Sequence, residues 1–139
     1  MLGGVEVPHD AGLTGHSDAD AVAHAVIDAL LGAACAGSIG DHYPDSDPRW
    51  KDADSMQLLR DVTSLVRERG YLVAHADVTI IAQRPQLAPH APAIAAALEA
   101  ALGTGAGNVN VKAKTNEGMG FIGREEGLAV IAVATLEAR

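Results

Sequence analysis

Residues 15–28 read Gly-His-Ser-Asp-Ala-Asp-Ala-Val-Ala-His-Ala-Val-Ile-Asp, and this stretch is the most informative part of the chain. It begins a predicted helix that runs from Ser17 to about Ala36. Ser17 and Asp20 match a capping box, in which a hydroxyl accepts from a free helix N–H and a carboxylate reaches back. The buried stripe of this helix is predicted from apolar residues at helical spacing, namely Val22, Val26, Ala29, Leu30 and Ala33.

The same helix start concentrates acidic and imidazole side chains. Asp20, His24 and Asp28 lie four residues apart, so they stack on one helix face. Capping and the helix dipole favour Ser and Asp here whatever the function, so each residue alone has a structural explanation. A metal-ligating histidine normally donates its other N–H to a carboxylate, a role open to Asp20 or Asp28. The set as a whole therefore favours a metal or phosphate site.

The composition indicates one globular protein domain. The chain has 139 residues and is 48% hydrophobic, but only 3% aromatic. A formal charge of −8 provides no electrostatic footprint for nucleic acid. No apolar run approaches the roughly 20 residues of a membrane helix, and residues 1–15 do not resemble a signal peptide. We therefore expect a soluble, cytoplasmic protein, in which the single cysteine, Cys35, is a small buried hydrophobe.

Apolar periodicity and turn residues predict the remaining elements. Further helices are expected over Asp54–Arg69 and Pro92–Leu102, and strands over Val5–Pro8, Tyr71–Gln83, Val109–Thr115 and Gly127–Leu136. A polar loop is expected over 38–53. This order predicts an α+β fold for residues 1–139, a single-domain two-layer sandwich with helices on one face of a mixed sheet.

Two loops have compositions that suit ligand binding. In Asp41–Pro48, two aspartates flank Ser46 between prolines, which is typical either of a plain turn or of a loop that binds a polar substrate. Residues 82–90 follow a strong strand and contain two prolines. Their backbone groups could recognise a flat base, or the segment could simply connect a strand to a helix.

A third segment, residues 112–124, is the most cationic part of this acidic chain. It contains Lys112, Lys114 and Arg124 together with three glycines, which permit close backbone approach to phosphate. Glu117 would repel a phosphate unless a divalent cation lay between them, which favours a magnesium-type ion. A solvated hairpin is the alternative interpretation.

Taken in order, these segments resemble the 2-C-methyl-D-erythritol 2,4-cyclodiphosphate synthase family of the non-mevalonate isoprenoid pathway. The resemblance extends from Gly3 to the C-terminus. The motifs that carry it are GHSDxD at 15–20 with His24, DALLGA at 28–33, YPDSD at 43–47, DVTIIAQxP at 77–85 and NVKAKTxExxGFxGRxEG at 110–127.

The resemblance implies a reaction and an assembly. The substrate would be 4-diphosphocytidyl-2-C-methyl-D-erythritol 2-phosphate, whose 2-phosphate attacks the β-phosphorus, closes the cyclic diphosphate and expels CMP. The family is a homotrimer with active sites between subunits. It uses a zinc-type ion and a magnesium- or manganese-type ion, which suits a reaction that brings two anions together.

The resemblance also implies roles for individual residues. His24 would bind the zinc-type ion, and Glu117 the second ion. His16 and Thr115 would be catalytic by stabilising the transition state. The implied substrate contacts are His16, Ser17, Ser38, Gly40, Asp45, Asp47, Phe121 and Arg124. The implied cytidine nucleotide contacts are Ala82, Gln83, Pro85, Leu87, Ala88, Lys114, Thr115, Asn116 and Glu117.

Two departures from the family pattern matter. Ser38 stands where the family usually has Asp, which we expect to tune substrate binding. The family's Asp-x-His motif, which supplies the other two zinc ligands upstream of Gly3, does not occur in this sequence. We therefore expect an N-terminally shortened synthase with weak activity. The alternatives are a non-catalytic trimer that binds cytidine nucleotides and an unrelated His/Asp-rich scaffold.

Overall fold

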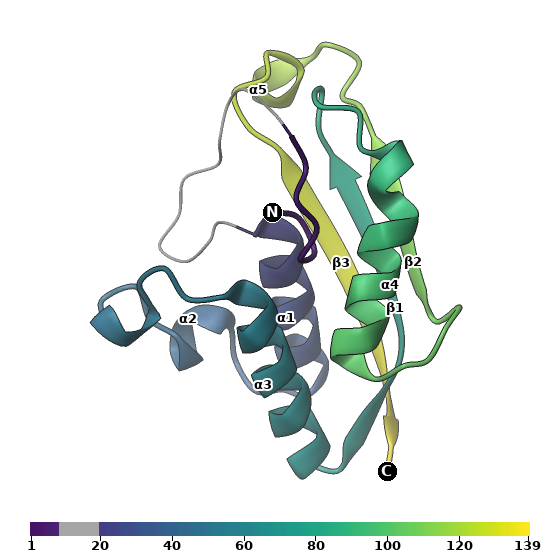
Figure 1. The fold of residues 1–139 in the computed structure, drawn as a ribbon. Helices are drawn as coiled ribbons and strands as arrows, with labels where there is room; N and C mark the ends of the chain where they lie inside the picture. Colours follow the sequence, from purple (N-terminus) through teal and green to yellow (C-terminus); the bar gives the residue numbers. More distant parts are fainter. Residues whose placement is uncertain (9–19) are drawn as a thin grey trace.

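The computed structural model describes residues 1–8 and 20–139, which form two layers (Figure 1). A mixed sheet has the order β2-β1-β3, with β1 parallel to β2 and antiparallel to β3. Helices cover one of its faces, which confirms the predicted α+β architecture. The helices are α1 (Ala21–Ala33), α2 (Ile39–His42), α3 (Ser55–Glu68), α4 (Ala91–Leu102) and α5 (Gly120–Gly123); the strands are β1 (Tyr71–Ile81), β2 (Val109–Lys114) and β3 (Ala129–Ala138).

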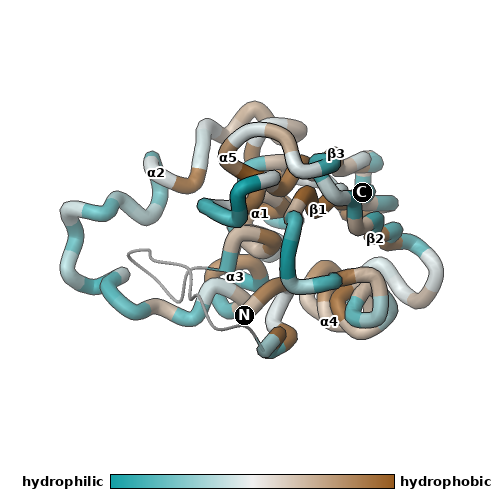
Figure 2. The backbone as a smooth tube through the Cα atoms, turned by 90° about the horizontal axis from the view of Figure 1, so that it is seen from above, coloured by the Kyte–Doolittle hydropathy of each residue, from teal (hydrophilic) through white to brown (hydrophobic). Residues whose placement is uncertain are grey.

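Aliphatic side chains form the core between the helices and the sheet. They recur at helical spacing on α1, α3 and α4, and every second residue of β1 from Ala76 to Ile80 faces them, which is the pattern expected of amphipathic elements. Figure 2 shows apolar residues gathered where the layers meet and a mostly hydrophilic segment between α2 and α3. Fully buried core side chains include Val22, Ile27, Leu30, Leu59, Val62, Ile80, Ile94 and Leu98. None of the helices among residues 1–8 and 20–139 is long and apolar enough to cross a membrane.

The opposite face of the sheet carries no helix (Figure 1). On β3, Ile131 and Val133 are 58% and 61% exposed. Next to them on β1, Asp77 accepts hydrogen bonds from Lys112 Nζ at 2.9 Å and Asn110 Nδ2 at 3.0 Å. The bond from Lys112, and then that from Asn110, lowers the pKa of Asp77. This open face thus carries the apolar side chains of Ile131 and Val133 on β3 and polar side chains on β2.

A buried carboxylate joins the N-terminus to the first helix. Asp20 is the N-cap of α1, and its Oδ1 accepts from Ala23 N at 2.9 Å and from Gly3 N at 2.8 Å. Its Oδ2 accepts from Gly4 N at 2.8 Å. A Cβ on Gly3 would lie 2.7 Å from Ile94 Cγ2, and its φ is +57°, so this turn requires glycine. The turn therefore wraps around the carboxylate.

Several local predictions about the N-terminal half are wrong. The N-cap of α1 is Asp20 and not Ser17, which lies outside the described residues, and the helix ends at Ala33 rather than near Ala36. The predicted strand Val5–Pro8 is reduced to a single bridge between Leu2 and Val5, because Asp20 binds the N–H groups of the turn between them.

The early end of α1 also changes the environment of the cysteine. Cys35 lies beyond the last helical turn with φ +53° and is exposed, so it is not the buried hydrophobe that we predicted. The predicted loop over 38–53 is also partly ordered, because it contains α2 and a 3-10 turn, η1, at Pro48–Trp50.

We predict that Asp20→Asn lowers the free energy of unfolding by about 3 kcal/mol. An amide removes the charge from three hydrogen bonds and turns a donor toward buried N–H groups. Chemical denaturation measures this, with Glu68→Gln on the exposed side of α3 as the matched control. Equal stabilities of the two variants would contradict the role given to Asp20.

Candidate functional site

The segments predicted to bind nucleotide meet at one edge of the sheet. Parallel strands end at the same edge, so the loops that follow β1 and β2 leave side by side. Ala82 N donates to Lys114 O at 2.9 Å, which joins their starting points. The structure thus brings together both predicted groups of nucleotide contacts: Ala82, Gln83, Pro85, Leu87 and Ala88 in one loop, and Lys114, Thr115, Asn116 and Glu117 in the other.

The loop after β2 is a series of tight turns. Asn116 Nδ2 donates to Met119 O at 2.7 Å, and Thr115 Oγ1 accepts from Glu117 N at 3.4 Å. Glu117 has a φ of +53°. Thr115 and Glu117 are exposed, as is Phe121, at 52%. The predicted catalytic hydroxyl and metal-binding carboxylate are therefore accessible to a ligand at the sheet edge.

The predicted substrate loop uses part of its polar set for its own structure. Ser38 N and Oγ donate to Asp41 Oδ2 at 2.9 and 3.2 Å, capping the short helix that contains Gly40. Asp47 accepts from Arg49 Nη2 at 2.7 Å, and this pairing lowers the pKa of Asp47. Asp45 is exposed in the turn between Pro44 and Asp47, where it is accessible to a polar ligand.

His24 contacts a residue that the sequence did not indicate. Its Nε2 lies 2.9 Å from Ser55 Oγ, and Ser55 is fully buried at the first position of α3. Asp28, one of the two carboxylates considered as a partner of His24, accepts from Ile39 N at 2.8 Å and so ties α1 to α2. The only sequence signal at Ser55 was a small polar residue at a helix start, which is typical of capping.

Comparisons with known proteins decide the family. A sequence profile of the YgbB family matches residues 1–137. The 2-C-methyl-D-erythritol 2,4-cyclodiphosphate synthase of Dechloromonas aromatica (strain RCB) is 56% identical over 137 residues, which are 99% of this chain and 86% of that protein. The chain belongs to the YgbB family. This confirms the family predicted from the ordered motifs and rules out the unrelated scaffold.

Solved structures of related proteins share the fold. The bifunctional IspDF from Campylobacter jejuni matches with a TM-score of 0.96 and 41% identity, over 100% of this chain but only 38% of that one. A CDP-bound form of 2C-methyl-D-erythritol-2,4-cyclodiphosphate synthase matches with a TM-score of 0.89 and 34% identity, over 99% of this chain and 89% of that one. The roles of single residues stay predictions.

The described residues do not form a complete metal centre. Among residues 1–8 and 20–139, no three His, Cys, Asp or Glu side chains are grouped so that they could hold a metal ion. A catalytic zinc site requires about three protein ligands, so His24 with its described neighbours does not fit one. Two other predicted site residues, His16 and Ser17, lie outside the described residues.

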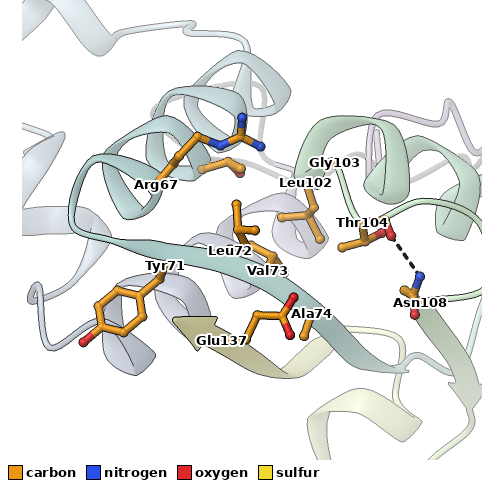
Figure 3. Close-up of a pocket in the computed structure, with 11 residues that line it drawn as sticks. Arg67, Tyr71, Leu72, Val73, Ala74, Leu102, Gly103, Thr104, Asn108 and Glu137 are labelled. Atoms are coloured by element: carbon orange, nitrogen blue, oxygen red, sulfur yellow. Dashed lines mark hydrogen bonds between the residues drawn. The ribbon is translucent and has the colours of Figure 1, made fainter. Parts of the chain in front are cut away.

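A cavity of about 460 Å³ lies at the opposite end of β1 from the candidate site (Figure 3). Arg67, Tyr71 and Glu137 contribute to its lining, together with the segment after α4. There, Asn108 Nδ2 donates to Thr104 O at 2.8 Å. None of the predicted site residues lines this cavity, so the candidate site is an open sheet edge and not this hollow.

We predict that Ser55→Ala destabilises the protein by about 1 kcal/mol, because it removes the hydroxyl that His24 contacts in a buried setting. The imidazole ¹⁵N shifts of His24 should change as well, since its Nε2 loses that partner. Ser64→Ala, at an exposed position on the same helix, is the matched control. Unchanged His24 shifts in Ser55→Ala would contradict the contact.

Proposed function

We propose that residues 1–139 form one cyclodiphosphate synthase domain. It converts 4-diphosphocytidyl-2-C-methyl-D-erythritol 2-phosphate to 2-C-methyl-D-erythritol 2,4-cyclodiphosphate and CMP, and so acts as a phosphorus–oxygen lyase. The observation that carries this proposal is the meeting of the loops 82–88 and 115–119 at the sheet edge, in a chain whose relatives bear that name. The CDP-bound relative supports a cytidine nucleotide as ligand.

The main requirement of this reaction is that the protein positions the reacting groups. An oxygen of the 2-phosphate bonds to the β-phosphorus while the bond from that phosphorus to the bridging oxygen of CMP breaks. The nucleophile is already an anion, so no strong base is needed, and the protein must hold two anions in line. The backbone of 82–88 would bind the base, the Thr115 hydroxyl would donate to the diphosphate, and Asp45 would accept from erythritol hydroxyls.

The remaining roles stay predictions. His16 and Ser17 would contact the phosphate and erythritol groups. A zinc-type ion at His24 and a magnesium or manganese ion at Glu117 are expected from the family resemblance. The described residues do not complete a metal centre at either position. Cytoplasmic localisation likewise remains a prediction from composition.

The open sheet face supports a homotrimer with active sites at subunit interfaces. Ile131 and Val133 expose their side chains on a face that the helices leave uncovered, and exposed apolar patches mark interaction sites. Another copy would cover this apolar row. In that arrangement one subunit would supply His24 and Asp45, and its neighbour would supply the nucleotide loops.

We predict that the purified protein releases CMP and forms the cyclic product, which ³¹P NMR detects together. Thr115→Val should slow turnover about 100-fold, because one hydrogen-bond donor to the developing charge is lost. Thr104→Val, beside the distant cavity, is the matched control. CMP binding without cyclic product would favour the non-catalytic nucleotide-binding alternative.

We predict that Val133→Glu converts trimers into monomers, because it places a charge in the apolar row that a neighbouring subunit would bury. Light scattering after size exclusion measures the mass. Ala96→Glu, at an exposed position of α4, should leave the trimer intact. A monomeric wild-type protein would show that the open face serves another purpose.

A further inference from the structure

Side chains connect the two loops beyond the ends of their strands. Gln83 Oε1 accepts from Gly118 N at 3.1 Å, and Arg84 Nε lies 3.1 Å from Glu125 Oε1. Both contacts run from the loop after β1 to the segment between β2 and β3, across 35 residues in the first case. We refer to Gln83, Arg84, Gly118 and Glu125 as the loop clasp.

Gly123 in α5 makes room for the Gly118 part of the loop clasp. A Cβ on Gly123 would lie only 2.0 Å from the carbonyl carbon of Gly118 and 2.5 Å from its oxygen. Real side chains never approach a backbone so closely, so the Gly118 peptide rests on the bare Cα of Gly123. α5 sits above the ends of β1 and β2 (Figure 1), and there Gly123 supports the carbonyl of Gly118, the same residue whose N–H binds Gln83.

We propose that the loop clasp sets the spacing of the two nucleotide loops and thereby the affinity of the site for cytidine nucleotides. This inference rests on the proposed function. Arg84 and Glu125 are then positioning residues, which act through the loop geometry and not by touching the nucleotide. The side chain of Gln83 has the same role, while its backbone remains a predicted contact of the base.

The energetic effect should be modest and dependent on salt. The side chains of Arg84 and Glu125 are 75% and 45% exposed, and exposed ion pairs are weak and screened by ions. The clasp acts by ordering two loops before the ligand arrives, which lowers the entropic cost of binding. Nucleotide affinity should therefore fall with ionic strength, and this dependence should shrink when the pair is removed.

The test is a charge-swap cycle with CMP as the probe. Calorimetry would measure CMP binding to Arg84→Glu, Glu125→Arg and the double variant, at low and high ionic strength. We expect each single variant to bind about fivefold more weakly at low ionic strength, with recovery to within about twofold in the double variant. Arg60→Glu, which breaks another exposed pair on α3, should bind like the wild type.

Two outcomes would overturn the proposal. Double variants that stay as weak as Arg84→Glu would mean that Arg84 contacts the nucleotide directly, and single variants with wild-type affinity would mean that the pair positions nothing. Hydrogen exchange of the 115–126 amides tests the clasp without nucleotide, and faster exchange in Arg84→Glu is expected. If the wild type binds no CMP while this exchange result holds, the proposed function fails but the clasp stands.

Discussion

The buried carboxylate of Asp20 is the contact on which the rest of the helical layer depends. Within the part of the chain that the structure describes, it accepts hydrogen bonds from three backbone N–H groups, two in the N-terminal turn and one in the first turn of α1. These donors have no helical partner, and buried donors without acceptors are costly. One side chain thus fixes where α1 begins and holds the N-terminal turn against Met56 and Ile94. His24, one turn further along, takes its position from the same cap.

A second constraint is the parallel pairing of β1 with β2. Backbone register alone places Ile81 opposite Lys114, so two loops distant in sequence must start at one edge. Beyond Ile81 and Lys114 the strands no longer pair, so side chains make the contacts between the two loops. The parallel edge therefore explains why the two loops start side by side, and the contacts of Gln83 with Gly118 and of Arg84 with Glu125 join them beyond that edge.

The elements that the sequence predicts well are those with a strong period. The boundaries of α3, β1 and α4 agree within about two residues with the predictions, because a buried stripe or alternation marks each of them. The errors occur where a tertiary contact competes with local preference. The strand predicted over Val5–Pro8 is only a single bridge between Leu2 and Val5, and the glycines between them bind Asp20.

Contacts between distant segments cannot be predicted from local sequence patterns, because they too depend on the tertiary structure. Ser55 lies 31 residues from His24, and no local period links them. The family resemblance predicted which loops bind nucleotide, but the bonds between these loops depend on individual side chains such as Gln83 and Arg84. Periodicity predicts layers, whereas the details of a site arise from the packing of those layers.

Contacts that the sequence does not show also limit how the cationic segment, residues 112–124, can bind a diphosphate. Of its three cations, Lys112 is bound to Asp77 at 2.9 Å and Arg124 to Glu126 at 3.0 Å. Lys114 is exposed at the last position of β2, and within residues 1–8 and 20–139 no carboxylate lies at ion-pair distance from it. A diphosphate can therefore engage Lys114 without competing with an ion pair, whereas at Arg124 it would compete with Glu126 for the guanidinium. The ion pair with Glu126 reduces the affinity that Arg124 contributes to such a ligand. The number of positive charges in the sequence therefore overstates that affinity.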